Sequence, residues 1–162
     1  MDDGRVRDLI EFLRLEPHPE GGWFRQMYRS PRSVAAGQPP ELRAAVTTIY
    51  FLLGAGQHSA WHQVGADEVW HFYEGALLEQ WVLPDVESVP ERRTLGPVGL
   101  ESTPVAVVPA GAWQASRTLG AYTLAGCTVA PGFEYQDFKL LRDLPEELET
   151  FRRRFPGLVY LL

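Results

Sequence analysis

Short runs of apolar residues, some alternating with polar residues and some continuous, recur along the chain between clusters of turn residues. Alternation with a period of two is typical of half-buried strands, and β-branched and aromatic residues favour strands over helices. The runs that we interpret as strands cover residues 23–30, 43–53, 76–84, 92–95 and 122–131. A polar, proline-rich segment over residues 31–42 is expected to form a surface loop. The pattern therefore predicts an all-β core.

Helical periodicity is confined to the two ends of the chain. The apolar residues near the N-terminus recur at helical spacing, at Val6, Leu9, Ile10 and Leu13. We predict a helix over residues 3–15, packed against the outside of the sheet. Similar spacing predicts a second helix over residues 144–155.

The stretch GQHSAWHQVGADEVWHFYEG, residues 56–75, contains most of the histidines. Its apolar and polar residues alternate, stop at a Gly-Ala-Asp turn and alternate again, which predicts two antiparallel strands joined by that turn. Because successive side chains of a strand point to opposite faces, Glu68, Trp70 and Phe72 share one face. We expect His62, on the preceding strand, to meet Glu68 in the interior of the sheet.

Composition narrows the class of protein. The chain has 162 residues, of which 45% are hydrophobic and 22% are charged, which suits one globular domain. Its 13 prolines and 15 glycines suit short strands joined by many turns. The net charge of −6 argues against general nucleic-acid binding.

The cellular location is predicted from what the sequence lacks. No apolar run approaches the roughly 18 residues of a membrane-spanning helix. The N-terminal residues MDDGRVRDLIEF include acidic side chains and no apolar core like that of a signal peptide. The single cysteine, Cys127, leaves no internal disulfide. We therefore expect a cytoplasmic protein.

Two motifs resemble those of the cupin superfamily. Gly56, His62, Glu68 and Gly75 match the anchors of the first motif, with Val64 in place of its second histidine. In residues 105–118, Pro109 and Gly111 match the second motif, while Gln114 replaces its histidine and Thr118 its asparagine. The resemblance implies a double-stranded β-helix, or jelly-roll barrel.

Longer phrases are similar to one cupin family, DUF985 or cupin-5, whose fold is of the RmlC-like type. These phrases are HPEGGWFRQMYRS, TTIYFLL, SAWHQVGADEVWHFYEG, VPAGAWQAS and GCTVAPGFEYQDF, within residues 17–142. We therefore expect one cupin domain over residues 1–162, with its barrel over about 20–140 between the two helices. The resemblance also implies a homodimer.

His62 and Glu68 are the predicted catalytic pair. A histidine beside a carboxylate suits general acid–base chemistry near neutral pH, as in an isomerase or epimerase. We expect the barrel to bind a small polar, carbohydrate-like molecule. The residues predicted to contact it, as hydrogen-bond donors or as aromatic walls, are Arg25, Tyr28, Tyr50, Trp70, Phe72, Trp113 and Gln114.

Two alternatives stay open at the level of sequence. His62, Glu68 and Gln114 are candidate ligands for one divalent metal (Zn, Mn, Ni or Fe), which would make the protein an oxygenase or a lyase. The missing histidines count against this alternative. The other alternative is a domain that binds a small molecule without turnover. His18, between two prolines, is interpreted as a loop residue.

Overall fold

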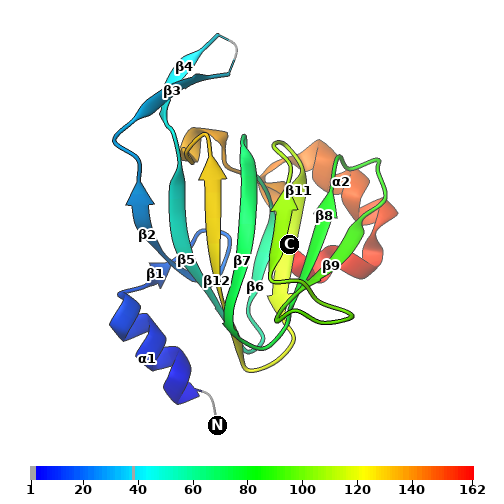
Figure 1. Cartoon of the computed structure of the whole chain (residues 1–162). Helices are drawn as coiled ribbons and strands as arrows, with labels where there is room; N and C mark the ends of the chain where they lie inside the picture. Colours follow the sequence, from blue (N-terminus) through cyan, green and yellow to red (C-terminus); the bar gives the residue numbers. More distant parts are fainter. Residues whose placement is uncertain (1–2, 38) are drawn as a thin grey trace.

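The computed structural model of the chain describes residues 3–37 and 39–162. Two antiparallel sheets form its body (Figure 1). The six-stranded sheet contains, in spatial order, β1 (Glu16–Pro17), β2 (Trp23–Arg29), β5 (Thr47–Gly54), β12 (Tyr122–Ala130), β7 (Asp67–Gly75) and β10 (Val105–Val108). The five-stranded sheet contains β13 (Lys139–Leu140), β6 (His58–Gln63), β11 (Trp113–Thr118), β8 (Leu78–Leu83) and β9 (Glu91–Leu95). The predicted all-β fold is confirmed.

The apolar faces of the two sheets pack against each other. Phe51 and Trp70, from the six-stranded sheet, share one cluster with Leu78 and Val82 from the five-stranded sheet. Phe51 and Trp70 are in edge-to-face contact, with ring centroids 5.6 Å apart. Burial of these side chains supplies the main driving force for bringing the sheets together.

The two predicted helices each cover part of the outer face of one sheet, although the sequence predicts such packing for the N-terminal helix alone. Leu9 of α1 (Asp3–Leu13) packs with Leu52 and Leu124 of the six-stranded sheet. Phe151 of α2 (Pro145–Arg154) packs on Trp61 of the five-stranded sheet, with ring centroids 5.1 Å apart. Two short helices flank α2 in the sequence, η2 (Leu141–Asp143) before it and η3 (Pro156–Leu161) after it. They contribute Leu141 and Leu161 to the same cluster.

The predicted pairing of the two strands in residues 56–75 is wrong. β6 pairs with β11 and β13, whereas β7 pairs with β12 and β10. The turn between them therefore carries the chain from one sheet to the other. Alternation correctly indicates which residues of each strand face inward, but it does not specify the partner strand. Inward-facing residues of β6 and β7 consequently approach the interior from opposite walls.

The segment expected to be a loop forms a small hairpin instead. β3 (Ser33–Ala36) pairs with β4 (Glu41–Ala44), and this hairpin projects beyond the two large sheets (Figure 1). The strand predicted over residues 43–53 begins only at Thr47, because Arg43 and Ala44 belong to β4 of the hairpin. The hairpin lies next in sequence to β2 and β5, whose ends border the site described below.

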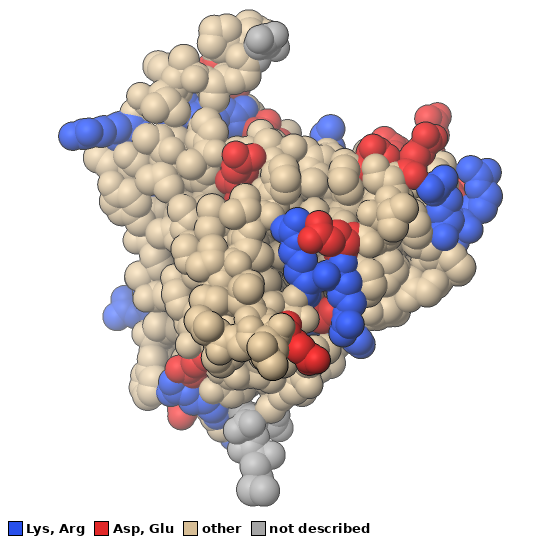
Figure 2. All heavy atoms as spheres, turned by 45° about the vertical axis from the view of Figure 1, so that its right-hand side comes forward, with Lys and Arg blue, Asp and Glu red and all other residues tan. Residues whose placement is uncertain are grey.

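Charged groups of opposite sign are intermixed on the face shown in Figure 2. Ion pairs on the five-stranded sheet include Arg92 and Arg117 with Glu79, and Arg93 with Glu91. In the described part of the chain, no helix is both long enough and apolar enough to span a membrane.

Candidate functional site

A cavity of about 260 Å³ opens between the two sheets. It is smaller than the roughly 300–1,000 Å³ typical of sites for drug-sized ligands. Its polar wall is formed by Glu16, His18, Glu20, Gln26, Thr47, His62 and Glu68. Its aromatic wall is formed by Phe24, Phe51, Trp70, Phe133, Tyr135 and Phe138. This mixture of apolar rings and a few convergent polar groups is typical of a small-molecule site.

His62 is held in a defined orientation by contacts at both ring nitrogens. Its Nδ1 lies 2.7 Å from the Ala60 carbonyl oxygen, which accepts a hydrogen bond and so requires the proton to be on Nδ1. Its Nε2 lies 3.3 Å from Oε2 of Glu20. Nε2 of the neutral ring therefore presents its lone pair to the Glu20 carboxyl group. The ring is buried, and burial lowers the pKa of His62, although Glu68 opposes this shift.

Glu20 is the centre of a buried polar cluster. The Ser59 hydroxyl donates a hydrogen bond of 2.7 Å to Oε1. Nδ1 of His18 lies 3.4 Å from Oε2 and accepts a hydrogen bond of 3.3 Å from the Glu20 backbone N–H. Burial raises the pKa of Glu20 to about 8, against the opposing effect of the Ser59 hydrogen bond.

These contacts specify where the proton resides at neutral pH. Both Nε2 of His62 and Nδ1 of His18 turn a lone pair toward the same oxygen of Glu20. Two lone pairs facing an ionised carboxylate would repel it, whereas a protonated Oε2 can donate to either nitrogen. Burial, together with the nearby His62, lowers the pKa of His18 to about 3. The cluster is therefore a neutral acid beside two neutral bases.

Glu68 belongs to a second set of contacts on β7 and β11. The Nε1–H of Trp70 donates to Oε1 of Gln114 at 3.0 Å, and Nε2 of Gln114 donates to Oε2 of Glu68. Because an indole nitrogen is only a donor, this contact fixes which end of the Gln114 amide faces Trp70. Burial raises the pKa of Glu68, and the nearby His62 opposes that shift.

Backbone irregularities bring the Glu20 cluster together. In β6, Ser59 and His62 pair with Ser116 and Gln114, so that β6 has one extra residue and both side chains turn inward. The chain before β2 packs directly on β6, where the Glu20 carbonyl oxygen accepts the Ala60 N–H at 2.7 Å. Gly21 has a φ of +111°, and a Cβ there would lie 2.3 Å from the carbonyl oxygen of His58. Only glycine permits this close approach.

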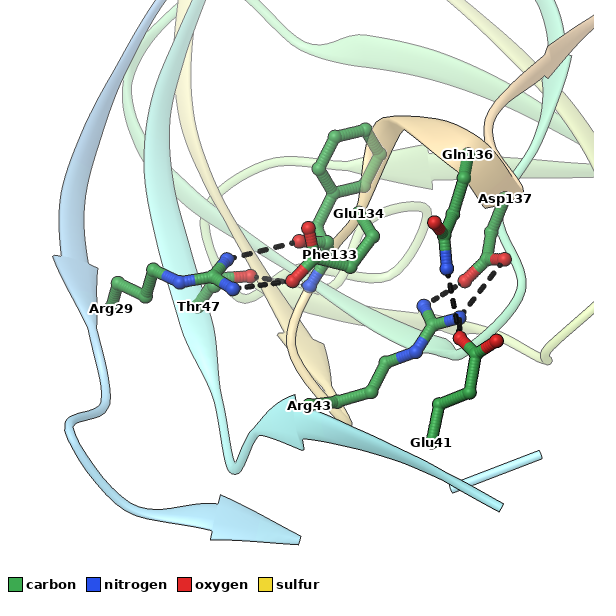
Figure 3. A network of polar contacts seen from close by, with 8 residues as sticks. All are labelled: Arg29, Glu41, Arg43, Thr47, Phe133, Glu134, Gln136 and Asp137. Atoms are coloured by element: carbon green, nitrogen blue, oxygen red, sulfur yellow. Dashed lines mark hydrogen bonds and ion pairs between the residues drawn. The ribbon is translucent and has the colours of Figure 1, made fainter. Parts of the chain in front are cut away.

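A short segment over residues 133–138 contributes part of the cavity wall. The segment contains the helical turn η1 (Tyr135–Asp137), flanked by Phe133 and Phe138. Its aromatic residues Phe133, Tyr135 and Phe138 all line the cavity. Arg29 of β2 pairs with Glu134, and Arg43 of β4 pairs with Asp137 (Figure 3).

Two further hydrogen bonds hold this segment. The Phe133 N–H donates to the Thr47 hydroxyl at 2.9 Å, and the Gln136 amide donates to Glu41 at 3.0 Å (Figure 3). The predicted loop over residues 31–42 thus contributes, through β4, to fixing the aromatic wall.

The structure places three predicted site residues on the cavity wall and one directly behind it. His62, Glu68 and Trp70 line the cavity, and Gln114 contacts Glu68 and Trp70. His62 and Glu68 face the same space from opposite sheets. The hydrogen-bonding partners differ from the prediction, since the carboxyl group closest to His62 is that of Glu20.

The other predicted contacts lie away from the cavity. Phe24 and Gln26 face inward, so Arg25 points outward, where it donates to the Leu13 carbonyl oxygen at 3.1 Å. An extra residue between Gln26 and Tyr28 in the pairing with β5 turns Tyr28 outward as well, and it is 49% exposed.

Tyr50, Phe72 and Trp113 are also absent from the cavity wall. Tyr50 packs in the cluster beneath α1, because its neighbours Ile49 and Phe51 take the inward positions. Phe72 packs in the core between the sheets. Trp113 lies in the cluster covered by α2, on the outer face of the five-stranded sheet.

Sequence reasoning missed His18, Glu20 and the aromatic residues of 133–138. The phrase HPEGG contained the only available signal: a histidine and a glutamate two residues apart before two glycines. His18 is in a loop as predicted, but its side chain packs edge-to-face on Phe24, with ring centroids 4.5 Å apart, and faces the cavity.

The metal set predicted from sequence does not fit this arrangement. The oxygen of Gln114, its only atom suited to a metal, already accepts the indole N–H of Trp70. Among the residues that the structure describes, no group of three or more His, Cys, Asp or Glu side chains is arranged to hold a metal ion. We therefore derive no chemical step through a metal at His62, Glu68 and Gln114.

Comparisons with known proteins agree with this architecture. A crystal structure of a protein from Shewanella oneidensis is 33% identical, covers 96% of this chain and 94% of its own, and superposes with a TM-score of 0.83. A hypothetical protein from Leishmania major is 29% identical, with 91% of this chain and 96% of that chain covered and a TM-score of 0.77. A search of curated proteins found no match.

More distant structures share the fold alone. Oxalate decarboxylase from Bacillus subtilis is 13% identical, with 80% of this chain and 30% of that chain covered and a TM-score of 0.56. The family model described as "Cupin superfamily (DUF985)" matches residues 7–141. The chain therefore belongs to the DUF985 family of the cupin superfamily.

Proposed function

We propose that the protein is an isomerase or epimerase that binds a small polar, carbohydrate-like carbonyl compound in this cavity and moves a proton within it. The observation that carries the proposal is the buried contact of 3.3 Å between Nε2 of His62 and Oε2 of Glu20. A buried base and a buried acid whose environments favour their neutral forms are matched for proton transfer near neutral pH.

His62 is proposed as the general base. Its Nδ1–H is engaged by the Ala60 carbonyl group, so the lone pair available for reaction is on Nε2. Nε2 would take a proton from the carbon next to the substrate carbonyl group. The charged ring that results would be stabilised by Glu68, which favours the protonated form of His62.

Glu20 is proposed as the acid. As the C–H bond breaks, its electron pair moves toward the carbonyl group, and the proton on Oε2 of Glu20 passes to the developing enolate oxygen. The Ser59 hydroxyl, which donates to Oε1, stabilises the carboxylate that remains. His62 then returns its proton to either carbon or either face of the enol, while the enol or enediol O–H that becomes the new carbonyl group gives its proton to Glu20. The product is the isomer or epimer, and both residues regain their starting states.

Solvent deuterium exchange provides the test, because it detects proton abstraction even where the equilibrium between isomers is unknown. A panel of aldoses, ketoses and amino sugars is incubated with the protein in D₂O, and loss of the proton next to the carbonyl group is followed by NMR. We expect exchange with the parent protein and a loss of at least about 100-fold in His62→Ala, the lower range for a general base.

His71→Ala is the matched control, because His71 is on β7 but is not part of the cavity wall. It should exchange as the parent does. Equal exchange in the parent and in folded His62→Ala would refute the role of His62. Saturable binding of a panel member without exchange would favour a non-enzymatic binding domain.

A further inference from the structure

The cavity has an unbalanced set of charges. The acidic side chains Glu16, Glu20 and Glu68 line it, whereas none of the described residues on its wall is a lysine or an arginine. Two arginines that contact the segment over residues 133–138 are already engaged. Arg29 and Arg43 pair with carboxylates of the segment that carries the aromatic wall (Figure 3). An anionic ligand would thus enter without a counter-charge.

Glu68 presents a buried carboxyl group to the cavity. Its Oε2 accepts a hydrogen bond from Gln114, and neither this donor nor the neighbouring Trp70 carries a positive charge. The side chain is only 6% exposed and lines the cavity. A buried carboxylate is costly where no lysine or arginine of the described cavity wall pairs with it, and a ligand that supplies positive charge would offset that cost.

Another part of the cavity wall is aromatic. The ring centroids of Phe133, Tyr135 and Phe138 lie 5.0 to 6.3 Å from one another. Phe138 also lies 5.6 Å from the His62 ring, so the aromatic group adjoins the polar one. Rings grouped around a small space attract substituted ammonium groups through the negative faces of their π-systems.

We propose that the ligand of this cavity carries an organic ammonium group, which sits between the carboxylate of Glu68 and the rings of Phe133, Tyr135 and Phe138. The inference rests on the proposed function only in assuming that this cavity is the binding site, and it names the charge class of the substrate. Glu20 and His62 would remain available for proton transfer, while Glu68 would recognise the charge.

A pair of probes of the same shape tests this charge preference. Choline and 3,3-dimethylbutan-1-ol differ only in a quaternary nitrogen replaced by carbon, and calorimetry or NMR titration gives their affinities for the parent protein. We expect choline to bind at least about tenfold more tightly, in keeping with a desolvated cation–π contact. Oxalate, a small dianion, should not bind.

Variants locate the effect. Glu68→Gln should weaken choline binding about tenfold and leave the neutral alcohol unchanged, because the amide keeps the shape and removes the charge. Phe138→Leu provides a second route should Glu68→Gln fold poorly, and it should also reduce the preference for choline. Glu74→Gln is the matched control on the same strand, since Glu74 pairs with Arg5 on the protein surface.

Equal affinity for choline and the alcohol, tighter binding of oxalate, or no binding of choline into the millimolar range would each overturn the inference. Choline has no carbonyl group and cannot be turned over by proton abstraction. Its binding is therefore independent of the deuterium exchange assay, and the two proposals can fail separately.

Discussion

Replacing Glu20 by glutamine should make the protein more stable above neutral pH. Glu20 is 7% exposed, and its carboxyl group faces two ring nitrogens that both present lone pairs. Glutamine has the shape of the protonated acid, and its NH₂ group can donate to His18 and His62 at every pH. Its oxygen can still accept the Ser59 hydroxyl.

The magnitude follows from linkage between proton binding and folding. The pKa of Glu20 is raised from 4.5 to about 8, so the folded state holds a proton that the unfolded state has lost. The stability from this proton is fully present below pH 4.5 and is lost as the pH rises to about 8.

His18 acts in the opposite direction at lower pH. Its pKa is lowered from 6.5 to about 3, so it destabilises the fold as the pH falls through that range. Between pH 4.5 and 6.5, Glu20 lowers the unfolding free energy as the pH rises, whereas His18 raises it. Between pH 6.5 and 8, the Glu20 effect exceeds that of His18. Over that interval Glu20 should cost about 2 kcal/mol of unfolding free energy.

Thermal unfolding at a series of pH values measures the effect. The melting temperature of the parent should fall between pH 6.5 and 8 by about 4–8 °C more than that of Glu20→Gln, given the usual scaling for a chain of this length. Glu101→Gln, at an exposed position, controls for the loss of one negative charge. Parallel curves for the parent and Glu20→Gln would refute the assignment of a proton to Glu20.

Two neighbouring residues of β8 give contrasting predictions for unfolding by urea. Glu79 is buried and pairs with Arg92 at 2.7 Å and with Arg117 at 2.6 Å. Glu79→Gln should therefore lower the unfolding free energy by about 1–2 kcal/mol. An unchanged urea midpoint would contradict this prediction. Gln80 points the other way, and neither of its amide atoms has a partner within the described residues, as is also true of the Ser116 hydroxyl. Gln80→Met should therefore be neutral or stabilise the protein by up to about 2 kcal/mol, whereas a clear loss would show that the amide is hydrogen-bonded in solution.

The sequence predicted local features of the fold better than their pairing. Both flanking helices and most strands follow from the spacing of apolar residues, and the motif residues His62 and Glu68 do face one interior. Their sheets could not be predicted, because alternation within β6 and β7 specifies two faces and no partner. The crossing between sheets depends on the whole barrel.

The errors within the site have a common physical cause. The alternation of side chains along a strand predicts which face each one takes only while every residue pairs with one residue of the neighbouring strand. A single extra residue reverses the faces of all the side chains beyond it. Such irregularities turn Tyr28 outward on β2 and bring Ser59 inward on β6. Glu20 was missed for a different reason: it reaches the cavity from a glycine-containing turn, whose path depends on its close contact with β6.

The contacts of Glu20 and Glu68 account for the departures from the general cupin motif. Gln114, in place of a histidine, is fixed by Trp70 and orients Glu68 without supplying a base. The bases of the cavity are instead His62 and His18, and both lie next to Glu20. One carboxyl group is thereby surrounded by proton acceptors, while the other receives a hydrogen bond from an amide and lines the cavity. Under the two proposals made above, this separation would let one small cavity combine proton transfer at Glu20 with recognition of positive charge at Glu68.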